Sequence, residues 1–262
     1  MSDGGMTVLE HPFQVKADGG FIRGAWFATD RAERLPLLAI LHGIPRARPK
    51  PGDESYREMA RRFAERGFAA LVFNFRGTGL SEGDLSMLGW ARDLAAVIEF
   101  GLSLPAVDAD RIALLGFSAG AAIAIYQAAR DPRIKAVVSA SSPAQFTFLE
   151  TTMPAEGWVK LFKEIGLIRD PAFPGSLAEW EREFEQVSPL AWIERISPRP
   201  VFLVHGEEDE VIPLEHAHRL YEKAGRPKQL VTVPAGKHRL RVDPGALDLI
   251  ERRLVNWRDG GR

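Results

Sequence analysis

A serine lies between two glycines at the point where an apolar run meets a helical stretch. Gly116-Phe117-Ser118-Ala119-Gly120 follows the apolar residues 111–115 and opens a run of small residues over 118–130. A residue held in a tight strand-to-helix turn has a strained backbone and projects its side chain above the sheet, while small neighbours avoid clashes. The helix start also offers free N–H groups to a developing oxyanion. Ser118 is therefore predicted to be a nucleophile; the alternative is a turn that only closes a strand.

Two later segments resemble loops of the α/β-hydrolase family, and the resemblance extends over nearly the whole chain. At the end of the apolar run 200–206, the residues from His205 to Pro213 (HGEEDEVIP) are similar to the family's H-G-x-x-D-x-x-[VI]-P acid loop, which implies Asp209 as the acid. After the last apolar run, Pro234 to His238 (PAGKH) are similar to its G-x-H loop, which implies His238 as the base. The family order of nucleophile, acid and histidine is kept.

A serine nucleophile requires the same residue types, an imidazole base and a carboxylate. A neutral imidazole takes the serine proton and returns it to the leaving group, and a carboxylate holds its tautomer. Of the six histidines, only His238 follows both nucleophile and acid in a loop after the final strand. His42 and His205 each stand before a glycine at a strand end, where structural hydrogen bonding is expected. A solvated surface residue remains the alternative for His238, as does a solvated charge run for Asp209.

Backbone N–H groups are expected to form the oxyanion hole. Ala119 follows the nucleophile and supplies the first. The second is implied by Leu41-His42-Gly43-Ile44, which resembles the family's H-G-x turn and marks the N–H of Ile44. The chain has Ile44-Pro45 where one esterase branch has H-G-G-G, which disfavours bulky tertiary-alcohol esters.

The remaining sequence alternates short apolar runs with helical stretches, which predicts a mostly parallel sheet with helices on both faces. An antiparallel pair is expected over about 7–28, with its turn at Asp18-Gly19. Further strands are expected at 36–43, 68–75, 111–115, 134–139, 200–206 and 229–234, and helices at 53–66, 90–103, 118–130 and 244–258. Between about 143 and 190 the alternation stops, and amphipathic patterns around Trp158 and Trp180 predict a small helical cap.

Composition excludes several classes of protein. The chain has 34 basic and 35 acidic residues, so its net charge of −1 gives no global field to attract nucleic acid or anionic membranes. It has no cysteine, which rules out disulfides, thiolate metal sites and a cysteine nucleophile. The amino terminus lacks a signal-peptide pattern, and the uncharged residues 112–129 fit a strand, turn and helix better than a membrane span. We expect a cytoplasmic protein.

Three further signals have competing interpretations. The glycines of residues 74–83 do not fit a dinucleotide or P-loop pattern, and this segment resembles the hydrolase N-x-R-G-x-G-x-S loop. Asp93 is predicted to be a charge near a helix start. Arg46, Arg48 and Lys50 form a basic loop, which is expected to be solvated; the alternative is a preference for anionic substrates.

The sequence thus predicts a single α/β-hydrolase domain over 1–262, with an eight-stranded, mostly parallel sheet and a cap at about 143–190. The expected activity is that of a serine hydrolase, first of all a carboxylesterase, acting on a small-molecule acyl substrate through an acyl-enzyme without a metal or organic cofactor. The alternatives are thioesterase, lactonase, peptidase or C–C hydrolase activity, and a catalytically silent ligand-binding protein.

Overall fold

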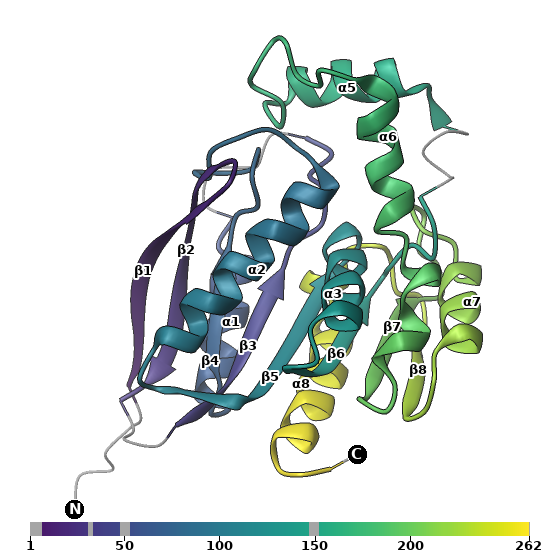
Figure 1. Ribbon diagram of the computed structural model, residues 1–262. Helices are drawn as coiled ribbons and strands as arrows, with labels where there is room; N and C mark the ends of the chain where they lie inside the picture. Colours follow the sequence, from purple (N-terminus) through teal and green to yellow (C-terminus); the bar gives the residue numbers. More distant parts are fainter. Residues whose placement is uncertain (1–6, 31–33, 48–52, 147–151, 262) are drawn as a thin grey trace, which may run out of the picture.

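The structure is a computed structural model that describes residues 7–30, 34–47, 53–146 and 152–261. Eight strands form one sheet in the order β1-β2-β4-β3-β5-β6-β7-β8 (Figure 1). β1 pairs antiparallel with β2, and β2 with β4; all other neighbours are parallel. The strands are β1 (Val8–Ala17), β2 (Gly20–Thr29), β3 (Leu35–Leu41), β4 (Ala69–Phe73), β5 (Val107–Phe117), β6 (Ile134–Ala140), β7 (Val201–Gly206) and β8 (Lys228–Val233). The predicted fold class is confirmed.

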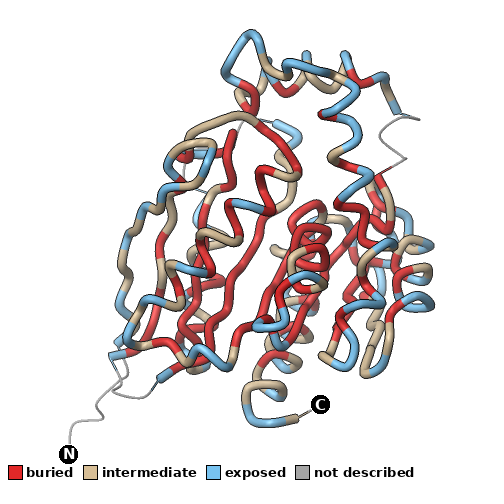
Figure 2. Tube along the Cα trace, in the orientation of Figure 1, coloured by how far each residue is buried: buried red, intermediate tan, exposed pale blue. Residues whose placement is uncertain are grey.

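Helices cover both faces of this sheet. They are α1 (Ser55–Glu65), α2 (Met87–Ser103), α3 (Ala119–Arg130), α5 (Ala155–Glu164), α6 (Leu177–Gln186), α7 (Glu215–Lys223) and α8 (Pro244–Arg258), with short 3₁₀ turns at Pro189–Ala191, Ile193–Ile196 and Leu240–Val242. One hydrophobic core lies under α1 and α8, and the other under α2 and α3. In Figure 2 the central strands are buried over most of their length, as strands covered on both faces should be.

The central strands explain why the sheet forms where it does. Every residue of β3 and of β4 is buried, and most are leucine, isoleucine, valine or alanine. Burying each large apolar side chain contributes about 1.5–3 kcal/mol relative to leaving it in water. β1, at the edge, instead alternates exposed and intermediate residues along much of its length. Parallel strands with continuous apolar runs therefore occupy the middle, and their carboxyl ends meet at one edge of the sheet.

Two elements begin earlier in the chain than the sequence predicts. β5 begins at Val107 and not at residue 111. Its first part is partly exposed and lacks an apolar run, so the sequence pattern did not reveal it. α2 begins at Met87 and not at residue 90, since Ser86 caps it by accepting the N–H of Gly89 at 2.9 Å. This earlier start places Asp93 inside the helix, fully buried, so its predicted role at the helix start is wrong.

The buried Asp93 is instead the partner of a buried arginine. Its Oδ1 lies 2.7 Å from Nη2 of Arg76, whose side chain is 6% exposed, and its Oδ2 accepts the Arg76 backbone N–H at 2.8 Å. Burial raises the pKa of Asp93, against the hydrogen bonds from Arg76. This ion pair fixes the segment after β4 against α2.

The cap helices, α5 and α6, follow β6 in the chain and lie outside the sheet (Figure 1). Each has one strongly apolar face, with Phe162 buried on α5 and Trp180 and Phe184 on α6. Trp180 attaches α6 to the core, because its Nε1–H donates to the carbonyl of Leu85 at 2.9 Å. No described helix combines the length and the apolar character that crossing a bilayer would take.

Candidate active site

The chain turns sharply from β5 into α3 at Ser118. This residue has φ 54° and ψ −124°. Residues other than glycine rarely adopt a positive φ, and this backbone conformation costs on the order of 1–3 kcal/mol. Its backbone N–H donates to the carbonyl of Ala140 at 2.9 Å, which attaches the turn to the end of β6. The residue is partly exposed, and its hydroxyl has no hydrogen-bond partner among the described residues. Strain at this position directs the hydroxyl out of the sheet.

Two glycines make this turn possible. A Cβ at Gly116 would lie 2.5 Å from Cα of Ala121, and one at Gly120 would lie 2.4 Å from the carbonyl oxygen of His42. Real Cβ atoms do not approach backbone atoms so closely, so any other residue would force the backbone apart. The second contact also means that α3 starts directly against the loop after β3.

The loops after β7 and β8 bring a carboxylate and an imidazole together. Nδ1 of His238 lies 2.9 Å from Oδ2 and 3.0 Å from Oδ1 of Asp209. The Asp209 side chain has no exposed surface, and that of His238 is 14% exposed. A close approach of the two backbones sets this distance: a Cβ at Gly206 would lie 2.2 Å from the carbonyl oxygen of Gly236.

The surroundings of Asp209 keep it ionised. Burial disfavours its charged form, but hydrogen bonds from His238, Ile212 and Val211 outweigh burial, and the pKa of Asp209 is lowered. The two backbone N–H groups donate to Oδ1 at 2.8 and 2.9 Å. An ionised carboxylate beside Nδ1 favours the tautomer that carries its proton there, which leaves Nε2 free to accept one. His205 supports the same loop, since its Nε2 lies 2.8 Å from the Ile212 carbonyl oxygen.

The loop that carries His238 then crosses the carboxyl edge of the sheet toward α1. Three residues later, Arg241 bonds to Asp53 at 2.9 Å and to the Ser55 hydroxyl. Its guanidinium lies 5.2 Å from the ring centre of Tyr56. His238 is therefore held between the acid loop after β7 and the start of α1.

This crossing passes the end of β5, where the serine turn lies. The Tyr56 ring is 6.0 Å from that of Phe117, the residue before Ser118. Among the described residues, no hydrogen bond joins the Ser118 hydroxyl to His238. The structure thus joins acid and histidine directly, and brings their loop and the serine turn to the same edge of the sheet.

The loop after β3 runs beside the serine. A Cβ at Gly43 would lie 2.9 Å from Cβ of Ser118. Nδ1 of His42 is 2.8 Å from the carbonyl oxygen of Gly43 and donates to it. Because a trans peptide is planar, with its C=O and N–H on opposite sides, fixing this carbonyl also fixes the direction of the N–H of Ile44. That N–H and the N–H of Ala119 have no hydrogen-bond partner among the described residues, so both are available to an oxyanion.

His42 is structural, as predicted. Its Nε2 accepts the backbone N–H of Phe75 at 3.2 Å, so Nδ1 carries the proton that is donated to Gly43. Burial lowers its pKa from 6.5 to about 4, although the bond to Gly43 opposes this shift. The ring is therefore neutral at pH 7 and connects the loop after β3 to the one after β4.

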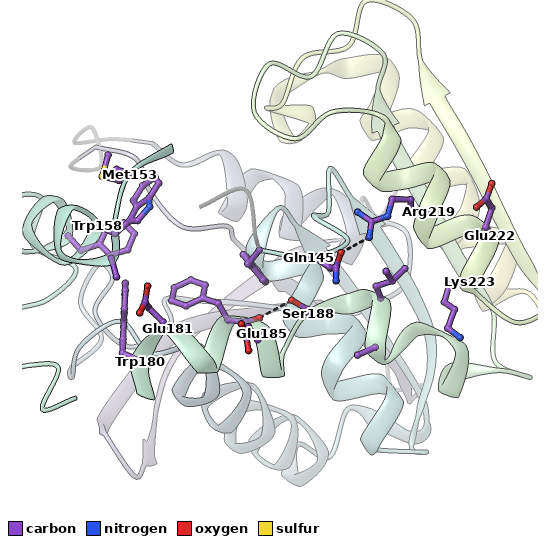
Figure 3. A pocket seen from close by; sticks show the side chains of 16 residues that line it. Gln145, Met153, Trp158, Trp180, Glu181, Glu185, Ser188, Arg219, Glu222 and Lys223 are labelled. Carbon is purple, nitrogen blue, oxygen red and sulfur yellow. Dashed lines mark hydrogen bonds between the residues drawn. The ribbon is translucent and has the colours of Figure 1, made fainter. Parts of the chain in front are cut away.

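A large cavity separates the cap helices from α7 (Figure 3). Its volume is about 880 Å³, within the range of sites for small organic ligands. A sealed, empty void of that size would cost on the order of 20 kcal/mol at about 24 cal/mol per Å³, which exceeds the stability of a typical domain. It is therefore an open, solvent-filled cavity and not a packing defect.

Two predicted features bear less on the site. Arg46 of the basic loop is exposed, while Arg48 and Lys50 lie outside the described residues. Across the part of the chain with described coordinates, no group of three or more metal-ligating side chains could hold a metal ion.

Comparisons with known proteins agree with this architecture. The family model for X-Pro dipeptidyl-peptidases (S15 family) matches residues 29–161, about half of the chain. A model for the Zn-dependent metallo-hydrolase RNA specificity domain matches the shorter segment 188–231. An uncharacterized protein of Mycobacterium tuberculosis is 31% identical over 238 residues, which cover 89% of this chain and 73% of the relative. The uncharacterized protein YfhR of Escherichia coli O157:H7 is 28% identical over 74% of this chain, and the chain spans 61% of its length.

Solved structures have the same fold. The α/β hydrolase GrgF from Penicillium sp. sh18 superposes with a TM-score of 0.73 at 21% identity, covering 95% of this chain and 99% of that one. The esterase domain of a Rhodothermus marinus protein superposes with a TM-score of 0.69 at 19% identity, covering 96% and 98%. The sheet and its helices define an α/β hydrolase. The chain belongs to this superfamily, and within it to the family of the X-Pro dipeptidyl-peptidase (S15) model.

Sequence reasoning missed two residues that hold the site together. Tyr56 lies within the helix predicted at 53–66, and Arg241 lies outside every predicted element; the sequence singled out neither residue. Both act across long distances in the chain, since Arg241 meets residues 53–56 only after folding. No local pattern marks such a contact, although an arginine three residues after a candidate catalytic histidine is a position to examine.

Proposed function

We propose that this chain is a serine hydrolase that cleaves a carboxylic ester through an acyl-enzyme intermediate. Ser118 is the nucleophile, His238 the general base and acid, and Asp209 the residue that orients it. The N–H groups of Ile44 and Ala119 form the oxyanion hole. The observation that carries the proposal is the pairing of the buried Asp209 with His238, whose loop crosses the sheet edge where the strained Ser118 turn lies.

The reaction has two balanced halves. Nε2 of His238 takes the Ser118 proton while the serine oxygen bonds to the carbonyl carbon, and the two amides bind the resulting oxyanion. The oxyanion collapses, the bond to the alkoxy group breaks, and His238 gives its proton to the departing alcohol. Water then attacks the acyl-enzyme with His238 as base, which releases the acid and restores Ser118. The side chains of the triad, two backbone amides and water carry these steps.

The test uses a fluorophosphonate probe and a panel of p-nitrophenyl esters, thioesters, lactones and aminoacyl amides. Wild type should be labelled at Ser118 and should turn over esters fastest, whereas Ser118→Ala should lose labelling and turnover. Comparable ester turnover by Ser118→Ala would reject the mechanism. An unlabelled wild type with no turnover would indicate a catalytically silent, ligand-binding member of the fold.

A second candidate is peptidase activity, which the match to the X-Pro dipeptidyl-peptidase model favours. The same groups would act, with His238 protonating a departing amine. A thioesterase is the third, since the thiohydrolase apmlB of Arthrinium phaeospermum is 38% identical over half of this chain. In the same panel, kcat/KM for aminoacyl-prolyl amides above that for esters would favour the peptidase, and a thioester optimum would favour the thioesterase.

A further inference from the structure

Two segments connect the cavity between the cap helices and α7 to the carboxyl edge of the sheet, where the Ser118 turn and the Asp209 loop lie. The first runs from Ala140, the hydrogen-bond partner of Ser118, to Gln145 in the cavity wall. Five residues reach at most about 18 Å, which limits the distance between serine turn and cavity. The second runs from the acid loop into α7, where Arg219 lines the cavity and its Nη2 donates to Gln145 Oε1 (Figure 3).

A second hydrogen bond links these two segments closer to the carboxyl edge of the sheet. The backbone N–H of Ala144 donates to Nδ1 of His216 at 3.0 Å. Since Ala144 follows β6 and His216 begins α7, this bond joins the cavity wall to the element that follows Asp209. The cavity is thus built onto the carboxyl edge of the sheet and not onto a remote surface.

Aromatic side chains form much of the cavity wall. Consecutive ring centres are 5.6, 6.1 and 5.0 Å apart along Trp158, Phe162, Trp180 and Phe184, and Phe146 adds a ring 5.4 Å from Phe184. Packing of the cap explains why these rings touch one another. It leaves unexplained why they also border an open volume of about 880 Å³, although Phe162, Trp180 and Phe184 are themselves buried. A wall of this kind binds large apolar groups, because their burial removes apolar surface from water on both sides.

The charges in the wall restrict which apolar groups fit. Glu181 and Glu185 lie one helical turn apart on α6, are exposed, and have no cationic partner among the described residues. Of the cations across the cavity, Lys223 pairs with Glu194 at 2.7 Å, whereas Arg219 bonds to the neutral amide of Gln145 and keeps its positive charge. Among the described lining residues, the carboxylates without a cationic partner, which include Glu222, outnumber this one cation, so the net unpaired charge facing the cavity is negative. A chain ending in a carboxylate is therefore repelled, and a neutral one is favoured.

We propose that this cavity binds a large, neutral, apolar group of the ester, either a long alkyl chain or an aromatic group. The inference rests on the proposed function, for which it defines the substrate class. It predicts high kcat/KM for long-chain neutral esters and low kcat/KM for acetates and for chains that end in a carboxylate.

The test fills the cavity from one side. Glu185→Trp places an indole in the cavity wall, and Glu179→Trp makes the same change on α6 outside the lining. Glu185→Trp should lower kcat/KM for p-nitrophenyl decanoate by roughly tenfold or more, since excluding two methylenes suffices for such a loss. Its kcat/KM for p-nitrophenyl acetate should stay within about twofold of wild type, as should both values for Glu179→Trp. A parallel series of butanoate esters with alcohols of increasing length tests whether the cavity binds the alcohol group of the ester and not its acyl group.

A binding measurement separates this inference from the proposed function. Ser118→Ala is titrated with a long-chain methyl ketone, which is not hydrolysed, and the fluorescence of the tryptophans in the wall is followed. Saturable binding that Glu185→Trp abolishes, together with a wild type that hydrolyses none of the esters, would keep the cavity assignment and reject the reaction. Equal use of decanoate and acetate by wild type, or no selective loss in Glu185→Trp, would overturn the cavity assignment while leaving the reaction intact. Should Glu185→Trp fail to fold, Glu181→Trp replaces it.

Discussion

His42 should make the protein less stable as the pH falls, and His42→Phe should remove that dependence. The pKa of the buried ring is about 4, whereas an exposed histidine has 6.5. Below pH 6.5 the unfolded chain therefore binds a proton that the folded chain does not. The sign follows directly: stability contributed by neutral His42 is complete above pH 6.5 and is lost as the pH falls from 6.5 toward 4.

The magnitude follows from the two pKa values. At pH 5 the difference in proton binding amounts to about 2 kcal/mol of unfolding free energy, and the full shift amounts to about 3 kcal/mol below pH 4. At pH 8 the variant should be the less stable protein, because it leaves the Gly43 carbonyl and the Phe75 N–H without their partner. Each unsatisfied group costs about 1–3 kcal/mol.

The assay is urea unfolding of wild type and His42→Phe at pH 8, 7, 6 and 5. The stability gap between them should narrow by about 2 kcal/mol from pH 8 to pH 5. Burial also lowers the pKa values of His205 and His216, so these residues add to the loss in both proteins and cancel in the difference. A gap that stays constant with pH would mean that His42 is protonated alike in both states, and would refute the reasoning.

Three other changes test the site and its supports. Asp209→Asn should leave the fold intact and lower kcat on the order of 10⁴-fold, because the amide favours the wrong imidazole tautomer; p-nitrophenyl ester turnover measures this, and near-normal kcat would contradict it. Gly206→Ala should push the acid loop away from Gly236, 2.2 Å from the added methyl, and lower both melting temperature and turnover; unchanged turnover would mean that the loops tolerate separation. Asp93→Ala should destabilise the fold by about 3 kcal/mol, because it removes the buried partner of Arg76 and leaves only the half-exposed Asp18 beside its charge; urea unfolding measures this, and an unchanged unfolding free energy would contradict it.

Local order in the sequence accounts for most of the fold. The apolar runs predicted as strands at 36–43 and 68–75 contain the fully buried strands Leu35–Leu41 and Ala69–Phe73, each of which ends two residues before the predicted end, since only burial on both faces tolerates such continuous apolar character. The antiparallel pair around Asp18-Gly19 forms as predicted, because the turn residues fix its register. The start of β5 was missed because its side chains are partly exposed, and exposed strand residues carry little periodic signal.

The sequence alone also located the strained turn at Ser118, because the glycines that this turn requires are close to it in the chain. Only the tertiary structure decided what surrounds it. The pairing of Asp209 with His238 depends on the contact between two backbone segments at Gly206 and Gly236. The ion pair of Arg241 with Asp53 joins residues almost 190 positions apart in the chain. The same holds for the cavity beside the cap helices. Chain connectivity sets local conformation through neighbouring residues, whereas distances between remote segments depend on how the whole core packs.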